Sequence, residues 1–259
     1  MPIRLLKQLL YGSLYLAIFS GLIWLVYSLE FKAAPSCFDN DRNGDETGID
    51  CGGSCISCEI KNLQMLSVGN TILFEADRDF SAVASIRNPN DIFGVNFFDY
   101  EAIFYDKSGT ALKSVRGTGF IYPGQEKNII EAGAKITEGI PSRAEIKLLN
   151  ENDIKWLRKE DFSEPEYGLR EISSYLENGQ VVVSGFVENV KNFTYSRIIV
   201  SAFALDNLGT RMGAGKSEIK NLNKFGAANF KIFIPVKKDY ADLVDFAGTK
   251  KTVSVEILK

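Results

Sequence analysis

Histidine is absent from this chain of 259 residues. Its absence excludes Ser-His-Asp and Cys-His nucleophile systems, zinc sites with histidine ligands, and histidine-based pH switches. A basic excess is also lacking, because 30 Lys and Arg residues face 33 Asp and Glu residues. A protein that binds nucleic acid needs a basic face to neutralise phosphates. We therefore expect no nucleic-acid partner, and we expect no enzyme, although composition does not exclude carboxylate chemistry.

Charge is lacking altogether from residues 8–29. A helix of this length measures about 33 Å, enough to cross a hydrocarbon core. Arg4 and Lys7 precede the stretch, whereas Glu30 and Lys32 cancel one another after it. The positive-inside rule then places the N-terminus in the cytoplasm. The predicted order is a cytoplasmic stub over 1–7, a transmembrane signal anchor over 8–30 that contacts the lipid bilayer, and an extracytoplasmic part after about residue 31.

A cleaved signal peptide is the alternative to this anchor. Such a peptide has an apolar region of only 7 to 15 residues, followed by small residues at the cleavage site. Small residues do occur at Ala33-Ala34-Pro35-Ser36. The apolar stretch is too long for a signal peptide, so we favour an uncleaved anchor in the cell membrane.

Cysteine is scarce, and all four cysteines fall within the predicted neck module, residues 31–58. The module has too few apolar residues to form a hydrophobic core of its own, so disulfide cross-links or a bound ion must stabilise its fold. Its extracytoplasmic location permits disulfides. We expect two disulfides among Cys37, Cys51, Cys55 and Cys58, with three pairings open.

Two other uses of these cysteines remain as alternatives. A four-cysteine zinc site usually combines two Cys-x-x-Cys pairs, but only Cys55 and Cys58 have that spacing. A redox pair at Cys55 and Cys58 would need a helix start that lowers the thiolate pKa. The surrounding residues are instead typical of a loop, namely Gly52, Gly53, Ser54 and Ser57.

The neck module also fits the pattern of a 12-residue calcium loop, apart from an aspartate in place of the final glutamate. Gly44 would form the sharp turn. A solvated acidic turn uses the same residue types, so both interpretations stay open. The predicted calcium ligands resemble those of thrombospondin type 3 and dockerin-like loops: Asp39, Asp41, Asn43, Asp45 and Asp50.

A longer motif begins at Asn43 and ends at Cys58. It reads Asn-Gly-Asp-Glu-Thr-Gly-Ile-Asp-Cys-Gly-Gly-x-Cys-x-x-Cys. This run resembles the NGDETGxDCGGxCxxC element of predicted microbial surface proteins, including membrane-anchored ones. The resemblance implies a location at the cell surface and says little about function, because that family is largely uncharacterised.

After residue 58, short runs of β-branched and aromatic residues alternate with Gly, Pro and Asn turns. This succession is typical of a β-sandwich. The order of runs recurs about 100 residues later, which indicates a duplicated domain. The predicted fold is mainly β, with two tandem Ig-like antiparallel β-sandwiches over 59–150 and 151–259. The second domain begins with a linker, and we expect Trp156 in this linker to pack the joint between the repeats.

Each copy contains a strand that ends in asparagine and a later strand that closes on Asp-x-x-Gly. This pattern resembles the FxLYD domains and the late-embryogenesis-abundant type of β-sandwich. The resemblance implies that Asp106 and Asp206 form turns and are not catalytic acids. The matching residues are Asn88, Ile103, Tyr105, Asp106 and Gly109 in the first copy, and Asn189, Phe203, Leu205, Asp206 and Gly209 in the second.

These patterns together predict a single-pass cell-envelope protein without enzymatic activity. Its two sandwiches would serve a structural or binding role toward a protein or an envelope polymer, and disulfides and calcium would stiffen the neck. The alternative is an envelope thiol-redox factor that uses Cys55 and Cys58, or an enzyme of unrecognised type.

Overall fold

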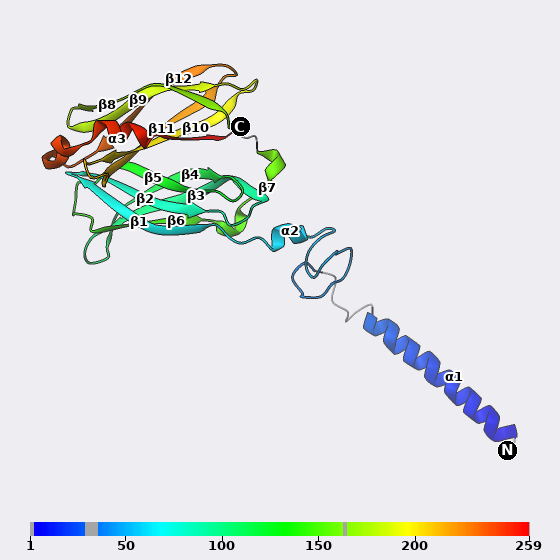
Figure 1. The fold of residues 1–259 in the computed structure, drawn as a ribbon. Coiled ribbons are helices and arrows are strands. Elements are labelled where there is room, and N and C mark those ends of the chain that lie inside the picture. Colours follow the sequence, from blue (N-terminus) through cyan, green and yellow to red (C-terminus); the bar gives the residue numbers. More distant parts are fainter. Residues whose placement is uncertain (1–2, 29–35, 163–164, 259) are drawn as a thin grey trace. The chain divides into compact units, whose positions relative to one another are not determined.

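The structure is a computed structural model, and it describes residues 3–28, 36–162 and 165–258. The described chain is mainly β, in antiparallel sheets, with an apolar helix near its N-terminus (Figure 1). It divides into two compact units, Met1–Leu63 and Gln64–Lys259.

The first unit contains helix α1 (Ile3–Val26), the neck module and the short helix α2 (Cys58–Lys61). Residues Leu6–Val26 are long and apolar enough to cross a membrane, and none of them is buried. The helix begins before the uncharged stretch, so Arg4 and Lys7 lie in its first two turns. Residues 29 and 30 of the predicted anchor, and the alternative cleavage region around Ala33, lie outside the described residues.

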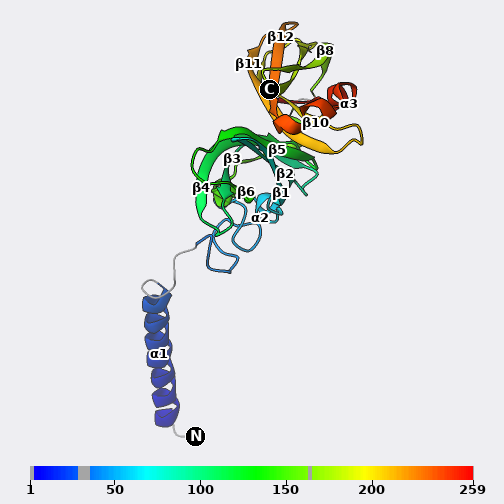
Figure 2. The same ribbon diagram turned by 90° about the vertical axis from the view of Figure 1, so that its left-hand side faces the viewer.

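The second unit contains two β-sandwiches, which Figures 1 and 2 show from two directions. In the first sandwich, β2 is the middle strand of one sheet and β3 is the middle strand of the other. One sheet consists of β1 (Ser67–Ala76), β2 (Asp79–Arg87) and β5 (Glu126–Lys135). The other consists of β4 (Ala111–Ile121), β3 (Phe93–Tyr105) and β6 (Arg143–Leu149), with the short strand β7 (Trp156–Arg158) also paired to β3.

The second sandwich repeats this topology. One sheet consists of β8 (Tyr167–Glu177), β9 (Gln180–Asn189) and β12 (Ala227–Pro235), and the other of β11 (Arg211–Leu222), β10 (Tyr195–Leu205) and β13 (Ser254–Leu258). Helix α3 (Phe246–Lys251) precedes β13. Register repeats as well, because Ala84 lies opposite Ile129 and Gly185 lies opposite Phe230 at the same sequence offset. The shared strand order supports the predicted duplication.

Alternate residues of the strands point into each core, as the two-residue period of a strand requires. Phe80, Ala82 and Ile86 of β2 are buried in the first core. Their counterparts in β9 are likewise core residues of the second sandwich, which include Val181, Val183 and Val187. Each sandwich therefore has its own hydrophobic core.

Trp156 differs from its predicted position. It lies in β7, pairs with Val95 of β3 and packs against the first core. The linker thus adds a strand to the first sandwich, so Trp156 is a packing residue of that sandwich and is not among the residues that join the two repeats.

Candidate functional site

Two disulfides close the neck module, as predicted. Cys37 is bonded to Cys55, with Cα atoms 5.7 Å apart, and Cys51 is bonded to Cys58, with Cα atoms 4.8 Å apart. Both separations lie within the usual range for disulfides. This pairing is one of the three that sequence spacing left open.

The observed disulfide pairing opposes both alternative uses of the cysteines, the zinc site and the redox pair. Cys55 and Cys58 are bonded to different partners, so they form no Cys-x-x-Cys disulfide. No free cysteine occurs among the described residues, which include all four cysteines, so none offers a thiolate to zinc or to a substrate in this state. Cys58 begins α2, but this helix has only four residues.

Two of the predicted calcium ligands accept backbone hydrogen bonds within the loop. The Asp50 carboxylate accepts from the N–H groups of Asp39 and Asn40, both at 3.0 Å. The Asp39 carboxylate accepts from the N–H of Asp41 at 3.0 Å and from the side-chain amide of Asn43 at 2.8 Å. The hydrogen bond from Asn43 is the largest cause that holds the pKa of Asp39 below its usual value, followed by that from Asp41. These carboxylates therefore organise the loop themselves.

Two further charged residues contact the loop backbone or its carboxylates, Glu46 within the loop and Lys61 in α2, and the sequence patterns predict neither role. Glu46 is buried, and its Oε2 accepts from the N–H groups of Asn43 and Asp50, each at 3.2 Å. Lys61 Nζ forms an ion pair with Asp50 Oδ2 at 3.3 Å. The spacing Asn43-x-x-Glu46 matches that of a capping box, although no helix begins at Asn43, and this spacing is the local signal for the contact.

The carboxylates of the predicted calcium ligands form no group of three within 4.8 Å among the described residues. Among the described residues, the only group of three Asp, Glu or Cys ligand atoms within 4.8 Å of one another is formed by Cys37, Glu46 and Cys55. Both cysteines of that group are disulfide-bonded, so they have no thiolate to offer. The side-chain oxygen of Asn43 is buried without a hydrogen-bond partner. A cation would therefore need the loop to rearrange.

Asp106 and Asp206 form equivalent turns in the two sandwiches. The Asp106 carboxylate accepts from the N–H groups of Ser108 and Thr110 at 2.8 and 2.9 Å. The Asp206 carboxylate accepts from the N–H groups of Leu208 and Thr210 at 2.9 and 2.7 Å. Such side-chain turns are the common role of aspartate at a hairpin. Hydrogen bonds hold the pKa of both carboxyls below the usual value, from Ser108 first for Asp106 and from Thr210 first for Asp206.

Asn88 and Asn189 are equivalent buried residues. The Asn88 amide donates to the carbonyl oxygens of Phe93 and Tyr122 at 2.7 and 3.0 Å. The Asn189 amide donates to the carbonyl oxygen of Phe193 at 2.7 Å and to two carbonyls at the end of β11. Each asparagine thus satisfies backbone carbonyls where strands end, which is a structural role.

The two sandwiches meet at a partly apolar joint. Val83 and Ile130 of the first sandwich form a buried cluster with Phe203 and Ala214 of the second. The Ser81 hydroxyl donates to the Ala214 carbonyl at 3.2 Å in the same region. The sheet containing β2 and β5 therefore packs its outer face against β10 and β11.

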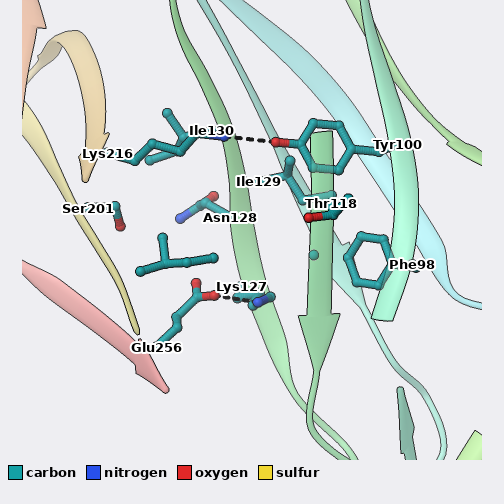
Figure 3. A pocket seen from close by; sticks show the side chains of 12 residues that line it. Phe98, Tyr100, Thr118, Lys127, Asn128, Ile129, Ile130, Ser201, Lys216 and Glu256 are labelled. Carbon is teal, nitrogen blue, oxygen red and sulfur yellow. Dashed lines mark hydrogen bonds and ion pairs between the residues drawn. The ribbon is translucent and has the colours of Figure 1, made fainter. Parts of the chain in front are cut away.

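Charged side chains surround a small cavity of about 30 Å³ in this joint, shown in Figure 3. Lys216 donates to the Tyr100 hydroxyl at 2.9 Å and to Glu131 at 3.0 Å. Lys127 forms an ion pair with Glu256 (Figure 3). Removal of one partner from a buried ion pair lowers stability by more than the intact pair contributes, because the other charge is left buried without a counter-charge. These contacts favour a single arrangement of the two sandwiches.

Burial shifts the pKa of several joint residues. It lowers the pKa of the Lys127 ammonium and raises the pKa of the Tyr100 hydroxyl. Burial also raises the pKa of Tyr122, whose hydroxyl donates to the Ile257 carbonyl, to about 12. For Lys216, burial acts against the charged form, but interactions with Tyr100 and Glu131 outweigh it and raise the pKa. Tyr100, Tyr122 and Lys216, whose pKa values are raised, therefore hold their protons to higher pH in the folded protein than in the unfolded chain, whereas Lys127 loses its proton at lower pH.

Comparisons with known proteins identify no family. No protein-family model matches the chain, and a comparison with curated proteins finds no match. Among solved structures, red sea bream transglutaminase is similar over 76% of this chain and 31% of its own, with 11% identity and a TM-score of 0.24. The chain thus spans less than a third of that enzyme, and a superposition at this score carries no inference about fold or activity.

Proposed function

We propose that this protein is a single-pass, membrane-anchored component of the cell envelope that presents two joined β-sandwiches outside the cell. The observation that carries the proposal is the disulfide-bonded neck, which follows an unburied apolar helix in the sequence. Disulfides persist in oxidising compartments and are rare in the cytoplasm. The residues after α1 therefore lie on the extracytoplasmic side, and the N-terminus lies in the cytoplasm.

The charges beside α1 support the same orientation independently. Arg4 and Lys7 lie at its N-terminal end, and excess positive charge remains on the cytoplasmic side of a membrane helix. The neck motif agrees with this location, because it resembles that of membrane-anchored microbial surface proteins. The sandwiches are proposed to be FxLYD-like or late-embryogenesis-abundant-like, since Asn88 and Asn189 make equivalent contacts.

The role is proposed to be structural or binding, without catalysis. The proposal is supported by the candidate catalytic side chains, which already have structural partners. The four cysteines are bonded in pairs, and the carboxylates of Asp106 and Asp206 accept hydrogen bonds in turns. β-Sandwiches commonly act as spacers and interaction modules, an argument by analogy from fold. A thiol-redox factor would need Cys55 and Cys58 to cycle together, which the observed pairing opposes.

Calcium binding to the neck is part of the proposal. Its support is the spacing of Asp39, Asp41, Asn43, Asp45 and Asp50, together with the unpartnered buried oxygen of Asn43. Calcium prefers oxygen ligands from carboxylates and amides. Calcium held by Asp39 and Asn43 Oδ1 would replace the hydrogen bond from the Asn43 amide to Asp39.

Fractionation and protease treatment of intact cells test the location. With an epitope tag at the C-terminus, we expect the protein to stay with membranes after a high-salt wash. We also expect external protease to remove the tag. A soluble protein would overturn the anchor, and a tag that becomes protease-sensitive only after lysis would overturn the orientation. A tagged cytoplasmic protein serves as the control for cell integrity.

A further inference from the structure

Two neighbouring cavities open where the sandwiches meet. The larger one, of about 690 Å³, is lined by the β1–β2 hairpin around Arg78, the end of β5, the β8–β9 hairpin around Asn178, and Pro235, Val236 and Lys238. The smaller one, of about 450 Å³, is lined by the end of β1 and by residues such as Arg211 and Tyr240. Both sandwiches contribute to each cavity.

The two cavities lie next to one another along the chain segments that line them. Glu75 and Lys237 line the smaller cavity, and their chain neighbours Ala76, Val236 and Lys238 line the larger one. Lys237 Nζ forms an ion pair with Glu75 at 2.9 Å, which links the sandwiches between the cavities. We call the two cavities together the joint groove. A linear polymer can contact both neighbouring cavities, whereas a compact small molecule occupies only one of them.

Unpaired charges line the larger part of the joint groove. Arg78, Lys135 and Lys238 lie there together with Asp77 and Asp79. No ion pair or hydrogen bond engages any of these five side chains in the part of the chain that the structure describes. Cations exceed anions here, in a protein whose net charge is −3. This part of the groove therefore favours a ligand that carries negative charge.

The remaining lining combines apolar surface with hydrogen-bonding groups. Buried Pro235 and Val236 provide an apolar floor, and the side chains of Asn178 and Gln180 provide amide donors and acceptors. Tyr240 in the smaller part is 49% exposed, and its side chain carries both an aromatic ring and a hydroxyl. An apolar floor with a few polar groups is typical of ligand clefts at domain interfaces.

We propose that the joint groove binds an acidic polysaccharide, a chain of sugar rings that bear carboxylates. Arg78, Lys135 and Lys238 pair with the carboxylates, while Asp77 and Asp79 accept hydrogen bonds from sugar hydroxyls. The Tyr240 ring packs against the C–H face of one sugar ring. This proposal rests on the proposed function, because it names the partner of an envelope protein with a binding role.

A polysaccharide fits the groove better than an acidic peptide does. Peptides commonly bind by adding a strand to an open sheet edge. The larger cavity is lined by hairpin turns and strand ends around Asp77, Gly179 and Lys238, not by an open edge. The carboxylates of Asp77 and Asp79 would also repel a peptide rich in Asp and Glu, whereas sugar hydroxyls can donate to them.

Binding to a defined probe tests the proposal. The full-length protein in lipid nanodiscs is titrated with oligogalacturonate, and with the same oligosaccharide after chemical reduction of its carboxyl groups. We expect oligogalacturonate to bind and the reduced probe to bind about tenfold more weakly or worse, because each lost ion pair is worth roughly that factor. We also expect Arg78→Ala combined with Lys135→Ala to weaken binding of oligogalacturonate by at least about tenfold.

Control variants outside the groove test whether the loss of affinity depends on the position of the removed charges. Arg116 and Lys220 are an exposed arginine and lysine outside the groove, so Arg116→Ala with Lys220→Ala should leave the affinity unchanged. Tyr240→Ala should weaken both probes, and an unchanged melting temperature shows that each variant is folded.

Three results would overturn the proposal: no binding by the parent protein at millimolar probe, equal affinity in the groove variant, or tighter binding of poly-glutamate than of oligogalacturonate. Because the protein is purified, these outcomes are independent of membrane topology. The proposed location can therefore fail in the fractionation experiment without affecting this one.

Discussion

Lys216 of the second sandwich donates a hydrogen bond at 2.9 Å to the Tyr100 hydroxyl of the first. The same ammonium reaches Glu131 at 3.0 Å, so one lysine side chain engages two partners across the joint. The two residues lie on strands β3 and β11, far apart in the sequence. The contact ties the orientation of the sandwiches, and hence the shape of the joint groove, to a buried polar network.

Removal of Lys216 should destabilise the joint. In Lys216→Ala, Glu131 loses its ion-pair partner while it stays largely buried, and unsatisfied buried groups of this kind cost about 1–3 kcal/mol. We expect the free energy of unfolding in urea to fall by that amount. Lys220→Ala is the control, because Lys220 is 75% exposed in its pairing with Glu218. Equal stability of the two variants would show that the network does not couple the sandwiches.

Alkaline pH should destabilise the folded protein through Tyr122. Its pKa rises from 10.0 to about 12 on folding, so the unfolded chain loses this proton first. Its stabilising contribution is therefore complete below pH 10 and is lost as the pH rises toward 12. Urea unfolding measured between those values should show falling stability, and Tyr122→Phe should reduce the slope. Tyr167→Phe, at an exposed position, should leave the slope unchanged; a slope insensitive to both variants would remove Tyr122 as its cause.

Acid should weaken the two aspartate turns. The pKa values of Asp106 and Asp206 are lower in the folded protein than the ordinary 3.8, so their contribution is present above that value and is lost as the pH falls through the folded pKa. We expect Asp106→Ala to lower the melting temperature at neutral pH, because two backbone donors lose their acceptor. Asp106→Asn keeps an acceptor oxygen and should lower it less. A larger loss in Asp106→Asn would contradict this account of the turn.

The disulfide pairing predicts which cysteines depend on one another. In Cys37→Ala with Cys55→Ala, the Cys51–Cys58 disulfide should still form, because its partners remain. In Cys55→Ala with Cys58→Ala, both remaining cysteines lose their native partners and should label with a thiol reagent or pair with each other. Peptide mapping by mass spectrometry distinguishes these states. A peptide that links Cys55 to Cys58 in the parent protein would refute the pairing.

Calcium should raise the melting temperature of the full-length protein if the loop closes around it. Selective binding to the native state stabilises a protein by mass action. We expect Asp39→Ala to remove the calcium-dependent increase. Asp242→Ala changes an exposed aspartate of the second sandwich and should preserve it. No shift in the parent protein would rule out the calcium site, and an equal shift in Asp39→Ala would place the ion elsewhere.

Local patterns predict the central strands well. In strands β2 and β9, apolar core residues alternate with other residues. Turns such as Asp106–Gly109, which follows β3, mark where a strand ends. Strands β1, β8 and β11 are not predicted. β1 and β8 lie at sheet edges with mixed burial, and β11 contains two glycines and four charged residues, so none shows a clean two-residue period. Helix α3 has only six residues, too few for a helical pattern.

In the neck, too, local sequence patterns predict only part of the candidate site. Four cysteines in a segment with little apolar content predict two disulfides, but spacing does not choose their partners. The roles of Glu46 and Lys61 depend on where the backbone N–H groups of the loop point, and on the place of α2 beside it. Residue types alone suggest calcium ligands, whereas the folded loop engages Asp39 and Asp50 internally.

The sequence by itself determines the features that depend on neighbouring residues: the apolar length of α1, the need for disulfides in the neck, the duplicated strand order, and the aspartate turns. Only the tertiary structure decides which cysteines pair, that Trp156 joins the first sandwich, and that Lys216 meets Tyr100. It also brings Arg78 and Lys238 from different sandwiches into one groove. The physical reason is that hydropathy and turn chemistry act within a few residues, while the joint depends on side chains that only folding brings together.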